Sequence, residues 1–258
     1  MLLEQSRFDE ALKAAEAQSR LTPDNRDVNY GRAVALRYLQ RVPEALSVLD
    51  HIEKTHPGFS RLYQERGHCY VTLRDAPRAI EAYQAAVNRN PALSASWAKL
   101  QTLYRMVGQP DNAAIAASHV EVTSKLPAAV LNATGLLCDG DLLEAEMLIR
   151  PYLLQHPQDI EAMRLLARIA MERDVVHDAD VLLAAVVELA PTYKAARYDY
   201  ARALMRRHKY GPALEQIDIL LAAEPDNRLY LTARATAYVG IGDHERALAL
   251  YRELLPNA

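Results

Sequence analysis

Two short stretches of the sequence have residue types that could hold a cofactor or a metal ion. VGIGDHE, residues 239–245, has two of the glycines of a dinucleotide-binding loop, and CDGD, residues 138–141, has carboxylate oxygens of the kind that calcium prefers. The first lacks the third glycine and does not follow a predicted strand, and the second lacks the further acids of a calcium loop. Both are predicted to be turns between helices, so no cofactor and no metal site is expected.

The residues that could act as nucleophiles or bases are poorly placed for catalysis. His68 and Cys69 are adjacent on one predicted helix, so their side chains point away from each other. Cys69 and Cys138 are far apart and lack the C-x-x-C spacing of zinc and redox sites, which suits packing roles in a reducing compartment. No catalytic residue is predicted, and the chain is not expected to be an enzyme.

Charge and hydropathy exclude two classes of partner. The 258 residues carry a net charge of −3, which offers no overall attraction for the phosphate backbone of nucleic acids. The start, MLLEQSRFDE, contains acids and lacks the apolar run of a signal peptide. The longest apolar stretch, around residues 181–190, contains Glu188 and is far shorter than the roughly 20 residues that cross a bilayer. We therefore expect a cytoplasmic protein that binds neither nucleic acids nor membranes.

A sequence repeat of 34 residues predicts the helices on which these residues lie. Eight alanines recur with separations of 34, 34, 34, 32, 34, 34 and 34, at Ala11, Ala45, Ala79, Ala113, Ala145, Ala179, Ala213 and Ala247. A proline follows twelve residues after most of them, at Pro23, Pro57, Pro91, Pro157, Pro191 and Pro225, with Lys125 and then Pro127 in the remaining repeat. A fixed period of this length indicates a solenoid, in which each unit buries its apolar face against its neighbours.

Each unit reads as two helices. Apolar and aromatic residues spaced by three and four run through both halves, as in Trp97, Leu100 and Tyr104, and the proline ends the second helix. The predicted fold is all-α: a right-handed superhelix with a half repeat at 1–25 and seven helix pairs that begin near residues 26, 60, 94, 128, 160, 194 and 228. Pro151 should interrupt and kink the second helix of the fourth pair.

These residues resemble the tetratricopeptide repeat family. The stretch YQERGHCYVTLRDAPRAIEAYQAAVNRNP matches the family pattern at Tyr63, Gly67, Tyr70, Ala79, Tyr83, Ala86 and Pro91. The resemblance covers nearly the whole chain. It implies a protein-interaction scaffold that binds a peptide or an adjoining domain in its concave groove.

A second resemblance is more detailed. The stretches at 59–83, 90–106, 161–186, 189–216 and 240–255 look like the amino-terminal repeat region of bacterial proteins that fuse tetratricopeptide repeats to a sulfotransferase domain. The R-S-G-T loop of that domain is missing here, so no sulfotransferase residue carries over. The alternative function is therefore the substrate-presenting repeat region of a sulfotransferase whose catalytic domain lies C-terminal to this chain.

Groove residues follow from helical geometry. Positions 2, 5, 9, 12 and 13 of the first helix of a pair share a face, which carries Tyr30, Arg37, Tyr38, Arg61, His68, Arg105, Arg164, Arg168, Tyr198, Arg202 and Arg206. Arg164, Arg168, Arg202 and Arg206 could form one cradle for an acidic, extended partner segment, with Tyr198 as a flat contact. Asp27, Glu161, Glu172 and Asp199 are interspersed, so a merely solvated face is an equal alternative. The family's carboxylate clamp uses Lys and Asn at these places, so chaperone C-termini are not the expected partner.

Both ends of the chain are expected to be cut within the repeat pattern. Residue 1 falls at about position 10 of a unit, and the last helix keeps an apolar stripe of Leu248, Tyr251, Leu254 and Leu255. Uncovered stripes of this kind mark interfaces. We expect weak self-association through this helix.

Overall fold

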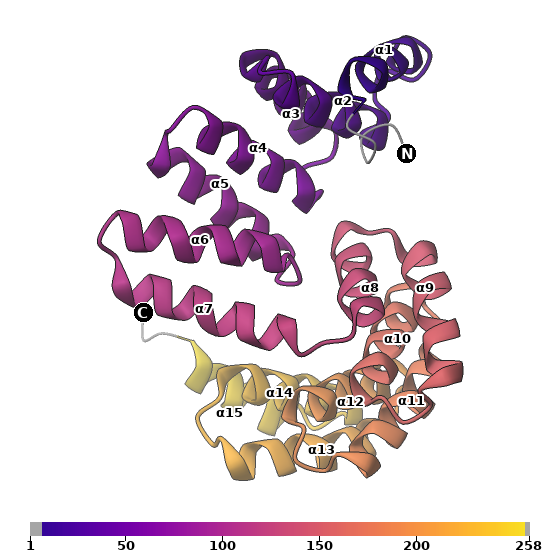
Figure 1. Ribbon diagram of the computed structural model, residues 1–258. Helices are drawn as coiled ribbons and strands as arrows, with labels where there is room; N and C mark the ends of the chain where they lie inside the picture. The colour runs from indigo at the N-terminus through magenta and orange to yellow at the C-terminus, as the bar shows by residue number, and fades with distance from the viewer. Residues whose placement is uncertain (1–6, 256–258) are drawn as a thin grey trace. The chain divides into compact units, whose positions relative to one another are not determined.

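The computed structural model describes residues 7–255, within which the chain forms fifteen α-helices and no strand (Figure 1). The helices are α1 (Phe8–Ser19), α2 (Arg26–Tyr38), α3 (Val42–Thr55), α4 (Ser60–Thr72), α5 (Ala76–Arg89), α6 (Ser94–Met106), α7 (Pro110–Ser124), α8 (Ala128–Asp139), α9 (Leu142–Gln155), α10 (Ile160–Glu172), α11 (Val176–Leu189), α12 (Lys194–Arg206), α13 (Tyr210–Ala223), α14 (Arg228–Ile241) and α15 (His244–Leu254). The predicted all-α repeat fold is confirmed. The first and last residues of the array predicted over 1–258 lie outside the described part.

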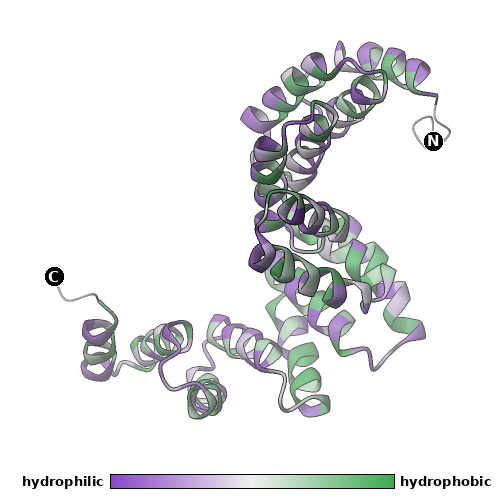
Figure 2. Cartoon of the chain, turned by 60° about the vertical axis from the view of Figure 1, so that its left-hand side comes forward, coloured by the Kyte–Doolittle hydropathy of each residue, from purple (hydrophilic) through white to green (hydrophobic). Residues whose placement is uncertain are grey.

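Helices that are consecutive in the sequence pack against each other, as in α2 with α3, α4 with α5 and α12 with α13. The even-numbered helices from α2 to α14 start at residues 26, 60, 94, 128, 160, 194 and 228, so their starts are separated by the same intervals as the alanines. Apolar and polar residues lie on the same helices (Figure 2), as in amphipathic helices that bury one face.

The repeated small residues lie where two helices approach closely. All eight alanines are buried, and Ala45, Ala79, Ala145, Ala179 and Ala213 have no exposed surface. At Gly67 on α4, a Cβ atom would come within 2.7 Å of the buried Tyr83 ring on α5. A larger side chain at these positions would push the two helices of a pair apart, which is why small residues recur there.

Each turn within a helix pair contains a residue in the left-handed conformation. Three are glycines, Gly108, Gly140 and Gly242, and four carry side chains, at Gln40, Arg74, Asp174 and His208, with φ between 58° and 62°. Gly140 is the glycine of the CDGD stretch, and Gly242 is the second glycine of VGIGDHE. The prediction that both stretches contain the turn between two helices is confirmed, and the positive φ explains these two glycines. The first glycine of VGIGDHE, Gly240, lies in α14, where a Cβ atom would come within 2.3 Å of the Tyr210 ring.

One hydrogen bond ties the fourth residue of a pair's first helix to the proline that precedes that helix. It joins Asn29 Nδ2 to Pro23 O (2.7 Å), Tyr63 Oη to Pro57 O (3.1 Å), Trp97 Nε1 to Pro91 O (3.0 Å) and Arg197 Nη2 to Pro191 O (2.7 Å). The bond recurs, but the size of the side chain that makes it varies from repeat to repeat.

Contacts divide the chain into two compact units, residues 1–141 and residues 142–258. The first contains α1 to α8 and the second α9 to α15. One continuous array over the whole chain stays a prediction. Pro151 lies inside α9, which continues to Gln155, so this proline does not interrupt the helix, and the predicted kink stays a prediction.

Candidate binding sites

The predicted groove residues on α2 are engaged within the first unit. Arg37 forms an ion pair with the buried Glu65 of α4, and its guanidinium lies 4.2 Å from the centre of the Tyr38 ring. Tyr38 also stacks on Phe8 of α1, with ring centres 4.2 Å apart. Tyr30 packs edge-on against Phe59, and burial raises the pKa of its phenol to about 12. This pKa keeps Tyr30 neutral at physiological pH.

His68 on α4 is turned into the core. Its Nδ1 lies 2.6 Å from the hydroxyl oxygen of Tyr83. Burial, with smaller contributions from Arg37 and Lys99, lowers the pKa of His68 to about 4. The imidazole is therefore neutral at pH 7. Its Nδ1 accepts a hydrogen bond from the Tyr83 hydroxyl, and the ring offers no positive charge to an acidic ligand.

Arg61, the remaining predicted residue of α4, lies at the end of α8. Its Nε is 3.7 Å from Oδ2 of Asp139, whose side chain is only 1% exposed. The other carboxylate oxygen of Asp139 accepts hydrogen bonds from the backbone N–H (2.8 Å) and the hydroxyl (2.5 Å) of Ser60. Asp139 thus caps the first turn of α4 from a helix 79 residues further along the chain, because Phe59 at the cap position offers no acceptor.

Two further side chains hold the end of α8 in place. Arg26, at the start of α2, donates to the carbonyl of Asp139 (3.5 Å) and to the carboxylate of Asp141 (3.0 Å). The buried Asn90 donates to Ser60 Oγ (3.2 Å) and to the carbonyl of Gly135 (3.4 Å). At these starts of α2 and α4, the first unit binds acidic side chains of its own chain.

Arg105, the predicted groove residue of α6, is exposed.

In the second unit, half of the predicted arginine cradle is paired internally. Arg164 donates to Asp199 (2.7 Å) and to the hydroxyl of Tyr193 (2.7 Å). Arg206 donates to the carbonyl of Met171 (2.6 Å) and to the carboxylate of Asp174 (2.7 Å). These four bonds connect α12, or the turn before it, with α10 and the turn after it.

Arg168, Tyr198 and Arg202 are the predicted residues of this face whose polar groups stay available. Arg168 is half-buried on α10, and Arg202 is exposed on α12. Tyr198 packs against Tyr230, with ring centres 5.7 Å apart. Burial raises the pKa of Tyr198, and the positive charge of Arg202 partly opposes that shift.

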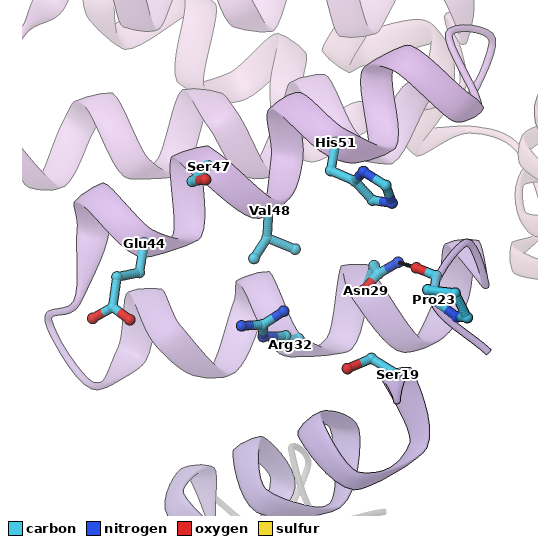
Figure 3. Close-up of a pocket in the computed structure, with 8 residues that line it drawn as sticks. All are labelled: Ser19, Pro23, Asn29, Arg32, Glu44, Ser47, Val48 and His51. Atoms are coloured by element: carbon cyan, nitrogen blue, oxygen red, sulfur yellow. Dashed lines mark hydrogen bonds between the residues drawn. The ribbon is translucent and has the colours of Figure 1, made fainter. Parts of the chain in front are cut away.

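A pocket that the groove positions did not predict lies between α1, α2 and α3 in the first unit (Figure 3). Its volume is about 410 Å³, and it is lined by Ser19, Pro23, Asn29, Arg32, Glu44, Ser47, Val48 and His51. Asn29 and Arg32 occupy positions 4 and 7 of the repeat, where the third pair has Trp97 and Leu100. A pocket of about 440 Å³ lies at the equivalent place of the next repeat, where Tyr63 and Arg66 occupy these positions. The departure from the repeat pattern is therefore a signal of the polar lining and not of the pocket itself.

Within residues 7–255, no group of three or more His, Cys, Asp or Glu side chains could hold a metal ion. In the same range, no helix is long and apolar enough to cross a membrane. Cys69 is a free, buried cysteine, and burial raises the pKa of its thiol to about 12, so it is not a reactive thiolate.

Three family models match the chain, each described as tetratricopeptide repeat. They cover residues 2–58, 60–93 and 176–237, which together make up more than half of the sequence. No curated protein sequence matches the chain.

Solved structures with a similar fold share little sequence with the chain. A crystal structure of MamA protein has 17% identity and a TM-score of 0.41, covering 77% of this chain and 91% of that one. A tetratricopeptide repeat protein from Parabacteroides merdae has 13% identity and a TM-score of 0.40, covering 98% and 88%. The Naa15/Naa10 complex bound to HypK-THB contains a chain with 19% identity and a TM-score of 0.44, covering 98% of this chain and 40% of that one.

Proposed function

The chain belongs to the tetratricopeptide-repeat family, and from this premise we propose that it is a protein-interaction scaffold. Its partner is a peptide or an adjoining domain that lies along the first helices of successive pairs. The observation that carries this proposal is the face of α10 and α12 in the second unit. There Arg168 and Arg202 have no internal counter-charge among the described residues, in contrast to Arg164 and Arg206.

The ligand that fits this face is an extended, acidic segment. Arg168 and Arg202 are equivalent positions of consecutive pairs, and Tyr198 lies between them in the sequence as a flat contact. Each exposed charge contact contributes about 0 to 1 kcal/mol, so two arginines supply up to about 2 kcal/mol. The complex should therefore be weak and should weaken further as salt screens the charges.

A peptide titration tests this proposal. An acidic peptide and its Gln-substituted counterpart are titrated against the wild type and an Arg168→Ala, Arg202→Ala variant at low and moderate salt. An Arg246→Ala, Arg252→Ala variant is the matched control, because it removes two exposed charges of the same unit from α15. We expect the acidic peptide to lose affinity only for the first variant. Equal binding to all three proteins, or binding that does not respond to salt, would leave the two arginines as a solvated face.

The alternative function is presentation of an acceptor to a sulfotransferase domain. It is supported only by the sequence resemblance of five stretches between residues 59 and 255. The coding sequence after codon 258 tests it. A strand, an R-S-G-T loop and a helix encoded there would support this function, and a stop codon would reject it.

We also propose a weak self-interaction through α15. Leu248 is 50% exposed and Leu255 is 66% exposed, while Tyr251 and Leu254 are half-buried. Replacement of Leu254 and Leu255 with Glu should raise the monomer fraction in light scattering. A wild type that is monomeric across a wide concentration range would contradict this proposal.

A further inference from the structure

The pocket between α1, α2 and α3 lies on a different face of α2 from the predicted groove. Asn29 and Arg32 are one helical turn apart and line the pocket together, whereas Tyr30 and Arg37 point to another side of the same helix. Figure 3 shows the Arg32 guanidinium between α2 and α3, with Glu44 and His51 on either side of it. A ligand here would not compete with one bound on the groove face.

Arg32 lies near the Glu44 carboxylate, whose pKa its charge helps to lower, but it forms no ion pair with that carboxylate. Its Nε atom is buried and has no hydrogen-bond partner, and no ion pair joins its side chain to an acid anywhere in residues 7–255. A guanidinium stays protonated in proteins, so the Arg32 side chain keeps its positive charge although it forms no ion pair. A partly buried charge without a partner is unfavourable, and an added acceptor would relieve it.

The arginine at the equivalent position of the next repeat has acidic partners that Arg32 lacks. Arg66 occupies the same position 34 residues later and donates to Asp50 (2.9 Å) and Glu53 (2.7 Å) of α3. The residue equivalent to Glu53 is Ser19, whose hydroxyl donates to the carbonyl of Glu16 (3.1 Å). One of the two acids has thus been replaced by a short, uncharged side chain at the edge of the pocket. The residue equivalent to Asp50 is still an acid, Glu16, but among residues 7–255 no ion pair joins it to Arg32.

A pocket recurs at the equivalent place of the next repeat, with a volume of about 440 Å³ and a lining that includes Glu53, Tyr63 and Arg66. There the Tyr63 ring lies 5.6 Å from the Arg66 guanidinium and 3.8 Å from that of Arg89. Asn29 keeps the hydrogen bond to the preceding proline but lacks the ring. The two pockets therefore differ in the side chains that surround the arginine and not in the space that they enclose.

The other titratable groups of the pocket already have hydrogen-bond partners. Both carboxylate oxygens of Glu44 accept hydrogen bonds from Arg41, each at 2.7 Å. His51 Nε2 lies 3.0 Å from Oδ1 of Asp24. Hydrogen bonding from Arg41, with a contribution from Arg32, lowers the pKa of Glu44, so this wall of the pocket carries a negative charge at neutral pH.

From these contacts we infer that the pocket binds a carboxylate, with Arg32 as its counter-charge and the hydroxyls of Ser19 and Ser47 as flanking polar groups. A singly charged, planar carboxylate matches one guanidinium fork, and the nearby Glu44 repels it less than it would repel a doubly charged phosphate. The carboxylate belongs either to an acidic side chain of a partner protein or to a free small acid. This site is independent of the face of α10 and α12.

The test uses two probes and three variants of the full chain. The probes are glutarate and a capped peptide, Gly-Ser-Glu-Ser-Gly, with the Gln peptide as its control. Ser19→Glu supplies the acid that Arg66 has, and Arg32→Leu introduces the residue found at Leu100 and Leu166. Arg66→Leu is the matched control, because it changes the equivalent position of the next repeat. Backbone amide shifts around Ser19 and Ser47 report binding, and circular dichroism confirms that each variant is helical.

We expect carboxylate binding to the wild type and to Arg66→Leu, and at least about tenfold weaker binding to Ser19→Glu and Arg32→Leu. Binding of glutarate alone would identify a free acid as the source, and binding of the Glu peptide but not the Gln peptide would identify a side chain. Failure of both carboxylate probes to bind the wild type would overturn the inference, as would equal affinity for the wild type and a folded Ser19→Glu. Neither outcome depends on peptide binding at Arg168 and Arg202.

Discussion

Removal of the Asp139 carboxylate should destabilise the first unit through the start of α4. In the Asp139→Ala variant, the N–H and hydroxyl of Ser60 lose their acceptor, and Ser60 has no exposed surface through which water could replace it. Loss of a helix cap costs about 1 kcal/mol, and a buried donor left without a partner adds about 1 to 3 kcal/mol. Release of a carboxylate from a buried site offsets part of this loss. We expect a net destabilisation of about 1 to 3 kcal/mol.

Asp139→Asn separates the hydrogen bonds from the charge. Burial raises the pKa of Asp139 above the usual value for aspartate, although the bonds from Ser60 oppose the shift. An acid whose pKa is raised in the folded state makes its full contribution to stability below the unfolded-state pKa. That contribution is lost as pH rises through the folded-state pKa. At neutral pH the Asn side chain keeps an acceptor without a buried charge, so its loss of stability should stay below about 1 kcal/mol.

Urea unfolding of both variants, together with hydrogen exchange of the Ser60 amide, measures these effects. Asp141→Ala is the matched control, because Asp141 pairs with Arg26 but does not touch the start of α4. In Asp139→Ala the Ser60 amide should exchange faster, and the unfolding midpoint should fall below those of the Asn variant and the control. Unchanged exchange and an unchanged midpoint in Asp139→Ala would refute the long-range cap.

Two other expectations concern the core. Ala79→Leu and Ala213→Leu should each destabilise the chain by about 1 to 3 kcal/mol, because both alanines are fully buried between the two helices of a pair. Thermal melting checks this against the exposed Ala114→Leu, and wild-type melting of both core variants would contradict the helix contacts. His68, whose pKa burial lowers to about 4, should contribute stability that is complete above pH 6.5 and is lost as pH falls toward 4. The stability advantage of the wild type over His68→Gln should shrink by about 2 kcal/mol between pH 7 and pH 5, and equal differences at both values would show that His68 titrates normally.

The fold could be predicted because its signal is repeated. Ala79 and its equivalents, together with the prolines twelve residues later, mark the same helix pair several times, so local ambiguity is averaged out. Gly140 and Gly242 were correctly interpreted as turn residues for the same reason. What a repeat pattern does not report is where the contacts divide the chain into compact units, as they do after Asp141.

The candidate groove could be predicted only as a set of positions. Helical spacing places Arg37, Arg164 and Arg206 on equivalent faces of their own helices, but their partners lie on other elements, at Glu65, Asp199 and Asp174. A spacing argument within one helix contains no information on such contacts. Whether an arginine is available to a ligand depends on the residue about one repeat away. Because Arg164 and Arg206 have such partners, only Arg168 and Arg202 of the four predicted arginines stay available.

A comparison between equivalent residues of neighbouring repeats also explains the lining of the pocket between α1, α2 and α3. Arg66 pairs with Asp50 and Glu53, whereas the residue one repeat before Glu53 is Ser19. Tyr63 places its ring near Arg66, whereas the equivalent residue near Arg32 is Asn29. Neither Asn29 nor Arg32 is unusual alone, since both residue types are common on helices. Compared with the next repeat, Asn29 takes the place of the ring of Tyr63, and Ser19 takes the place of one of the two acids that pair with Arg66. In a repeat protein, a position is therefore best judged against its equivalents in the same chain, because the neighbouring repeats show which contacts the architecture normally supplies.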